Sequence, residues 1–159
     1  MLRKGLFYIV CLLALMLTAC ESADCTLQNK VALYGAFYYE SESVMIDKDT
    51  LTITAIGTDS VLLNRGLKVH KFAVPMSYAG EVDTFVLHVF GKDVDVRDTL
   101  WVRKTNYPHF EAPDCPAFFF HDIKGYGTTN HFIDSIKLTF PIVDFSQYEH
   151  FKIYLRATL

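Results

Sequence analysis

The stretch DTFVLHVFG, residues 83–91, contains the pattern that decides the fold class of this chain. Phe85, Leu87 and Val89 recur at every second position, and this period places their side chains on one face of a β-strand. β-Branched and aromatic residues favour strands, and Gly91 begins a turn. We therefore predict a strand over 83–91 whose alternating apolar side chains face a core.

Similar segments recur on both sides of this strand and are separated by turn residues. They span 30–39, 50–57, 59–64, 68–76, 94–104, 117–125, 132–143 and 149–156. Helices are an alternative for windows rich in Phe and Leu, but the β-branched content argues against them. The pattern predicts an all-β fold of eight or nine short strands. We expect a two-sheet antiparallel β-sandwich, immunoglobulin-like in general architecture, in preference to a closed barrel.

Two places in the pattern predict irregular chain. Asp98 lies inside the segment 94–104 and suggests a break or a bulge there. The stretch NYPHFEAPDCPAFFF, residues 106–120, contains prolines that each fix φ and lack a backbone donor. It is therefore expected to form an ordered loop without repeating structure, which places Cys115 just before a hydrophobic strand.

The first twenty residues, MLRKGLFYIVCLLALMLTAC, resemble a bacterial lipoprotein signal. Arg3 and Lys4 precede an uncharged run over 5–19, which has the length of a signal peptide and is short for a membrane span. The run ends in LTAC, residues 17–20, which matches a lipobox with Cys20 as the lipid-attachment residue. A transmembrane helix, or a secreted protein with an incidental cysteine, is the alternative.

This interpretation divides the chain into a cleaved signal peptide (1–19), a short lipidated tether (20–28) and a single β-sandwich domain (29–159). Acyl chains on Cys20 would hold the protein at a membrane. Cys25 follows five residues later, and five extended residues reach at most ~17 Å, so the domain is expected close to the lipid headgroups.

Cys25 and Cys115 are the two cysteines left once the signal, with Cys11, and the lipidated Cys20 are set aside. Export takes the chain to an oxidising compartment, where an even count of thiols favours a disulfide. A buried free thiol and an intermolecular bridge are the alternatives. A Cys25–Cys115 bridge would close a loop of about ninety residues and would stabilise the fold by roughly 4–5 kcal/mol.

Several of these features together resemble a family of small Bacteroidetes lipoproteins classed as a domain of unknown function. The features are the lipobox, the cysteine shortly after it, VALYGAFYY (31–39), APDCP (112–116), FIDSIKLTF (132–140) and HFKIYL (150–155). The resemblance covers nearly the whole mature chain and implies outer-membrane attachment and the cysteine pair, with no established activity. Family members more often have Gly where this chain has Pro116. The resemblance also implies an outer-membrane protein as a partner, because such genes often neighbour one for a predicted outer-membrane protein.

The acidic residues after Cys20 bear on which membrane face carries the domain. Glu21 and Asp24 are dispersed, whereas surface export in such bacteria uses a compact acidic cluster. The periplasmic face of the outer membrane is therefore favoured, with the cell surface as the alternative. The chain has a net charge of −3 and no basic stripe, so nucleic acid is not expected as a partner.

No motif predicts an enzyme, a cofactor or a metal site. The chain lacks G-x-S-x-G, and GYGTT (125–129) is neither a phosphate-binding nor a dinucleotide-binding loop. The segment DVDVRD (93–98) does not fit an EF-hand, although Asp93 and Asp95 leave a loose surface calcium site as an alternative. Histidines occur singly, with His121 and His131 able to approach each other across a turn. They are His70, His88, His109, His121, His131 and His150.

Three aromatic residues are the weakly predicted ligand-binding set: Tyr34, Tyr38 and Trp101. On solvent-facing strand positions their flat rings could stack on sugars or pack against a protein, but buried aromatics are more common. We expect a lipid-anchored, non-enzymatic interaction or accessory module at the outer membrane. The alternative is a surface lipoprotein that binds glycan or another small ligand through an aromatic face.

Overall fold

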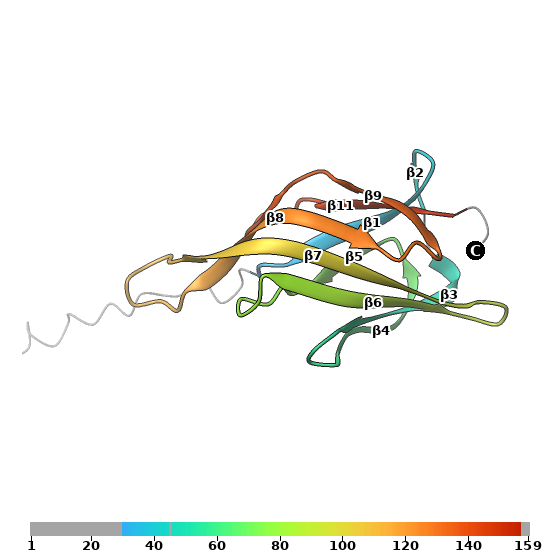
Figure 1. Ribbon diagram of the computed structural model, residues 1–159, viewed down its shortest axis with the longest axis horizontal. Coiled ribbons are helices and arrows are strands. Elements are labelled where there is room, and N and C mark those ends of the chain that lie inside the picture. The colour runs from blue at the N-terminus through green and yellow to red at the C-terminus, as the bar shows by residue number, and fades with distance from the viewer. Residues whose placement is uncertain (1–29, 45, 157–159) are drawn as a thin grey trace, which may run out of the picture.

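A computed structural model describes residues 30–44 and 46–156, and these residues form eleven strands and no helix (Figure 1). The six-stranded sheet has the order β10 (Ile142–Val143), β8 (Phe118–Thr128), β7 (Asp95–His109), β6 (Val82–Phe90), β3 (Ile46–Ala55), β4 (Ser60–Val69). The five-stranded sheet has the order β2 (Glu42–Ser43), β1 (Leu33–Tyr39), β11 (Phe151–Leu155), β9 (Ile133–Leu138), with β5 (Lys71–Val74) also paired to β1. The predicted all-β sandwich is confirmed.

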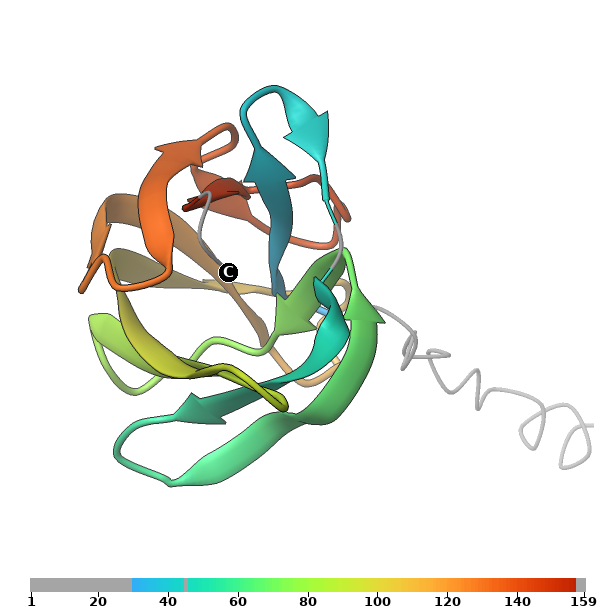
Figure 2. The same ribbon diagram turned by 90° about the vertical axis from the view of Figure 1, so that its right-hand side faces the viewer.

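The alternating apolar residues of the strands form the core, as predicted. Phe85, Leu87 and Val89 in β6 are at most 2% exposed, and they face Leu33 and Phe37 of the other sheet within one hydrophobic cluster. In Figure 2 the two sheets enclose this interior. Burying each such side chain contributes about 1.5–3 kcal/mol, so this cluster is the main source of stability.

The five-stranded sheet contains one parallel pair, which the antiparallel prediction did not include. β1 and β11 run in the same direction, with Gly35 opposite Phe151 and Phe37 opposite Ile153. All pairs of the six-stranded sheet are antiparallel. Alternation sets which face of a strand is buried but does not identify its neighbour, so the sequence pattern could not reveal this pair.

One continuous stretch of chain connects the two sheets. β4 ends at Val69 and β5 begins at Lys71, so only His70 separates a strand of the six-stranded sheet from a strand of the five-stranded sheet. Figure 2 shows this green ribbon rising from one layer to the other. β5 then leads through residues 75–81 to β6, and this loop returns the chain to the six-stranded sheet.

Two boundaries differ from the predicted elements. The segment 132–143 divides into β9 and β10, and β2 is a further two-residue strand, which together give eleven strands in the described ranges in place of eight or nine. The irregular loop predicted over 106–120 is shorter, because β7 continues to His109 and β8 begins at Phe118. Pro108 is tolerated in β7 because β6 pairs with β7 only as far as Arg103 and leaves that edge open.

The predicted break at Asp98 is wrong. β7 pairs with β6 without interruption from Asp95 to Arg103, and Asp98 is only 1% exposed. Its carboxylate accepts hydrogen bonds from Thr129 Oγ1 and from the backbone N–H groups of residues 131–133, at 2.7–2.8 Å. The side chain thus fastens the chain between β8 and β9 to β7, and this long-range role is not visible in local sequence.

Candidate functional site

The cysteine predictions lie largely outside the part of the chain that the structure describes. Cys20 and Cys25 both fall in residues 1–29, so lipid attachment and the Cys25–Cys115 pairing stay predictions. Cys115 lies in the loop between β7 and β8 and is 8% exposed.

The structure places the three predicted aromatic residues on two different sheets. Trp101 projects from β7 in the six-stranded sheet, whereas Tyr34 and Tyr38 lie on β1 in the five-stranded sheet. All three alternate with buried residues, so they point to the outer faces of opposite layers. They therefore do not form one aromatic surface.

Tyr34 and Tyr38 already have partners within the protein. The Tyr34 ring stacks on His150, with 6.0 Å between centroids. The Tyr38 hydroxyl donates to Glu149 at 3.1 Å, and Lys152 Nζ lies 4.7 Å from the centre of its ring. Burial, together with the hydrogen bond to Glu149 and its charge, raises the pKa of Tyr38. These contacts leave little ring surface for a ligand.

Trp101, by contrast, presents 42% of its surface to solvent. It stands opposite Gly127 of β8, and a Cβ at that glycine would come within 2.4 Å of Trp101 Cζ2. The indole therefore lies directly over the glycine backbone, and the absence of a side chain at residue 127 lets it do so. This places a broad aromatic surface on the outside of the sheet.

Other apolar side chains lie on the same outer face of the six-stranded sheet. Cross-strand partners in antiparallel sheets share a face, and Val61, Thr54 and Val86 form one row across β4, β3 and β6. Leu67, Thr50 and Phe90 form a second row across the same strands. The exposed apolar members of this face, here called the outer apolar face, are Val61 (55%), Leu67 (68%), Val82 (53%), Phe90 (42%) and Trp101 (42%).

Three arginines lie on or beside the outer apolar face. Arg97 and Arg103 are exposed outward-facing residues of β7, and the Arg65 guanidinium lies 5.9 Å from the centre of the Phe90 ring. Asp95 is an acidic residue on the same face, paired with His88 at 2.8 Å and with Arg97 at 3.5 Å. Arg65 and Arg103 thus place positive charge on this face of a chain whose net charge is −3.

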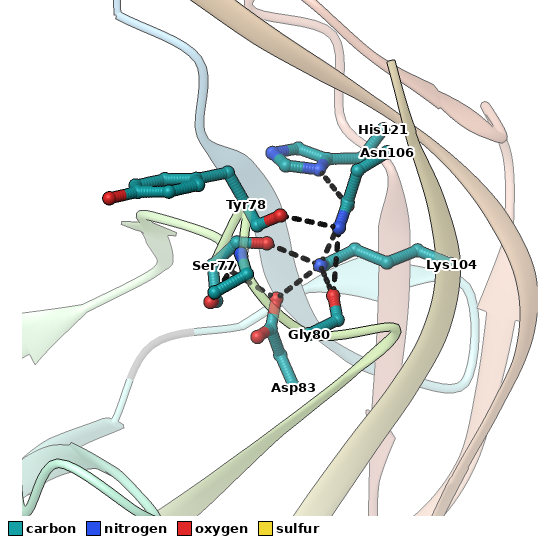
Figure 3. A network of polar contacts seen from close by, with 8 residues as sticks. Ser77, Tyr78, Gly80, Asp83, Lys104, Asn106 and His121 are labelled. Carbon is teal, nitrogen blue, oxygen red and sulfur yellow. Dashed lines mark hydrogen bonds and ion pairs between the residues drawn. The ribbon is translucent and has the colours of Figure 1, made fainter. Parts of the chain in front are cut away.

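A buried lysine forms a polar network inside one end of the sandwich (Figure 3). Lys104 has a side chain that is 0% exposed and follows Leu100 and Val102 on the inner side of β7. Its Nζ donates to the carbonyl oxygens of Ser77 and Gly80, the latter at 2.7 Å, and to Asn106 Oδ1 at 2.8 Å. These three acceptors match the three donors of an ammonium group.

Two titratable groups flank this network, Asp83 and His121. Asp83 Oδ2 accepts the N–H of Ser77 at 3.1 Å and lies 3.4 Å from Lys104 Nζ, and burial raises the pKa of its carboxyl despite the lysine. His121 Nδ1 lies 2.7 Å from Asn106 Oδ1. Burial and the positive charge of Lys104 lower the pKa of His121 to about 4, so the ring is neutral at pH 7 and donates from Nδ1.

A cavity of about 480 Å³ opens beside the network. Its walls come from the β3–β4 turn, the loop before β6 and the start of β6. Leu62, Met76 and Phe85 make it mainly apolar, and Ser77 and Asp83 belong both to its wall and to the Lys104 network. Ligand pockets usually have volumes of roughly 300–1,000 Å³ and few polar groups.

Sequence reasoning missed Lys104 and Asp83. The signal was present, because Lys104 continues the buried alternation of Leu100 and Val102, and Asp83 precedes Phe85 by two positions on the buried face of β6. A charged residue at an inward-facing position of a strand indicates that it has a buried partner. The partners in the loop of residues 77–80 are set by topology and could not be read from the pattern.

The histidines form no metal centre in the described ranges, where no group of three or more His, Cys, Asp or Glu is placed to hold an ion. His121 contacts Asn106, and His131 contacts Asp98 at 3.0 Å, so the two histidines have separate partners. His150 is fully buried between the backbone N–H of Tyr34 and the carbonyl of Ile142. Each of the three therefore has a structural contact.

The model of a protein family of unknown function, DUF6452, matches residues 50–155, which include all of the six-stranded sheet except the first four residues of β3. No curated protein and no solved structure matches the chain. Within residues 30–44 and 46–156, no helix has the length and apolarity needed to cross a membrane.

Proposed function

The chain belongs to the DUF6452 family of unknown function, and we propose that it is a lipid-anchored, non-enzymatic interaction module at the outer membrane, with the periplasmic face favoured. The lipobox at Cys20 supports the anchor, and the short tether after it supports a working position near the membrane surface. The observation that carries the interaction role is the outer apolar face of the six-stranded sheet.

This face has the composition of a protein-binding surface. Five large apolar side chains are each at least 42% exposed, and Arg65, Arg97 and Arg103 lie among or beside them. Interface centres are enriched in Trp, Phe and Arg, and exposed apolar patches with polar rims commonly mark interaction sites. The arginines specify the partner further, because a complementary surface is apolar at its centre and acidic at its edge. We infer an outer-membrane protein with such a surface.

Photo-crosslinking in cells tests this proposal. A benzoylphenylalanine placed at Val61 or at Trp101 is expected to capture the same membrane protein. One placed at Tyr148 is expected to capture none, because that residue is 59% exposed but lies outside this face, in the loop between β10 and β11. Arg97→Glu with Arg103→Glu should abolish capture from residue 61, because it places acidic groups against an acidic rim. Lys137→Glu, an exposed change on β9, serves as the charge control. Equal capture from all three positions would contradict the proposal.

The second candidate function is glycan binding through Trp101 on the same face. It is supported by the position of the exposed indole over Gly127, since flat exposed aromatic rings stack on sugars. It predicts binding on a glycan array that Trp101→Ala removes, together with no protein crosslink from Val61. Capture of one membrane protein with an unreactive glycan array would reject this candidate.

A further inference from the structure

The cavity beside Asp83 contains an acceptor that the protein leaves unused. Both short contacts of the Asp83 carboxylate, to Ser77 N–H and to Lys104 Nζ, are made by Oδ2. Among the described residues Oδ1 has no hydrogen-bond partner, and in Figure 3 this oxygen points away from Lys104. Asp83 is 9% exposed and belongs to the cavity wall. Asp83 Oδ1 is not among the buried polar atoms without a partner, so it is accessible to solvent, and it has acceptor capacity that no protein donor uses.

The surroundings restrict which molecule can use that acceptor. The cavity is mainly apolar, with Leu62, Met76 and Phe85 in its wall, so it favours an apolar body. Lys104 lies 3.4 Å from Asp83 and balances its charge, so a cation gains little there. An anionic carboxylate has no hydrogen to donate to the Asp83 oxygen. The best match is a neutral hydrogen-bond donor.

We propose that this cavity binds a small neutral molecule with an apolar body and a hydroxyl group, which donates to Asp83 Oδ1. Tyr78, 67% exposed and stacked on Phe119 at 5.1 Å, forms part of the rim. The site does not involve the lipid anchor, and of the outer apolar face it shares only Val82. A test that rejects ligand binding in this cavity would therefore leave the proposed interaction role standing, and the reverse also holds.

Hexan-1-ol and hexanoate form a matched pair of probes, because they share a six-carbon chain and differ in the head group. The protein is the chain from residue 20 onward with Cys20→Ser, which retains both sheets and the whole core. In a titration followed by ¹H–¹⁵N NMR, hexan-1-ol should produce saturable shifts at the amides of Met76, Tyr78 and Asp83. Hexanoate should bind at least tenfold more weakly. Absence of saturable shifts there, or equal affinity for both probes, would overturn the proposal.

Variants connect the selectivity to the carboxylate. Asp83→Asn removes the charge and keeps the size, so the preference for hexan-1-ol over hexanoate should fall to less than about threefold, whereas Asp134→Asn on β9 should retain the full preference. Met76→Trp should fill the cavity and abolish binding of both probes, which keeps the test valid if Asp83→Asn does not fold. A tenfold preference that persists in Asp83→Asn, or binding that persists in Met76→Trp, would refute the assignment.

Discussion

Lys104 and its partners show how a single residue can organise one end of the sandwich. The lysine occupies an inward-facing position of β7. Its ammonium group donates hydrogen bonds to the carbonyls of Ser77 and Gly80 in the loop between β5 and β6. Burying a charge is costly unless its donors are satisfied, and here all three are. The loop that forms one wall of the cavity is thus held from inside.

Replacing Lys104 with Met should destabilise the domain by about 3–5 kcal/mol, because Asp83 and the Ser77 carbonyl lose the lysine as a partner in a buried site. Urea unfolding measures this change. Lys104→Met combined with Asp83→Asn should cost less than the sum of the two single changes, because the buried charge is removed as well. Lys124→Met is the matched control, since that lysine is half exposed and paired with Asp122, and it should cost less than about 1 kcal/mol. Equal losses at both lysines would contradict this account.

His121 predicts a pH dependence of stability. Its folded-state pKa is about 4, below the ordinary value of 6.5, so between these pH values the unfolded chain binds a proton that the folded domain does not. The free energy of unfolding should therefore fall as the pH drops from 6.5 toward 4, by at most about 3 kcal/mol from this group. Urea unfolding of His121→Gln at several pH values should show a smaller decrease. Part of the decrease should remain, because burial also lowers the pKa of His150.

His70→Gln removes an exposed histidine and serves as the control. It should show the same decrease in stability as the unmodified protein. A His121→Gln protein with an unchanged pH profile would show that this ring does not resist protonation in the folded state.

At the scale of elements, alternation of apolar residues was sufficient to predict the strands but not their partners. The segments 83–91 and 50–57 correspond closely to β6 and β3, because each has one buried face and one exposed face. The parallel pairing of β1 with β11 and the length of β7 depend on which chains lie alongside, and periodicity contains no information about neighbours. For the same reason, the sequence suggested Trp101, Tyr34 and Tyr38 as ligand-binding residues but could not show that Trp101 lies on a different sheet from the two tyrosines.

The contact between β7 and β8 at Trp101 can be tested with Gly127→Ala. The new methyl group would occupy the space under the indole, so Trp101 must swing outward while the strands stay paired. Trp101 is the one tryptophan of the chain, and its fluorescence maximum should shift to longer wavelength. The stability change should be less than about 1 kcal/mol, because alanine is more favourable than glycine in a strand.

Gly80→Ala is the matched control for this change, since a Cβ there approaches no atom closer than 3.7 Å. Its fluorescence should equal that of the unmodified protein. An unshifted spectrum in Gly127→Ala would show that the indole does not rest on the glycine.

The molecule as a whole is expected to be closed by a Cys25–Cys115 bridge. Cys115→Ser should lower the free energy of unfolding by roughly 4 kcal/mol, because the bridge closes a loop of about ninety residues in the unfolded chain. Cys25→Ser should cost the same, and the double variant should cost no more than either single change. Denaturation under non-reducing conditions measures all three. Additive losses would indicate that the two thiols act separately.

The proposed lipid anchor at Cys20 would hold the outer apolar face and its arginines close to a membrane. Because five extended residues span at most ~17 Å, a bridge at Cys25 would keep the domain near the headgroups. A partner embedded in the same membrane would then meet this face at high effective concentration.

Metabolic labelling with an alkyne fatty acid, followed by membrane fractionation, tests this account most directly. The unmodified protein should incorporate the label and sediment with the outer membrane, whereas Cys20→Ser should be unlabelled and soluble with an unchanged circular dichroism spectrum. If Cys20→Ser remained labelled, or if the unmodified protein were unlabelled and soluble, the lipid-anchored account would be wrong.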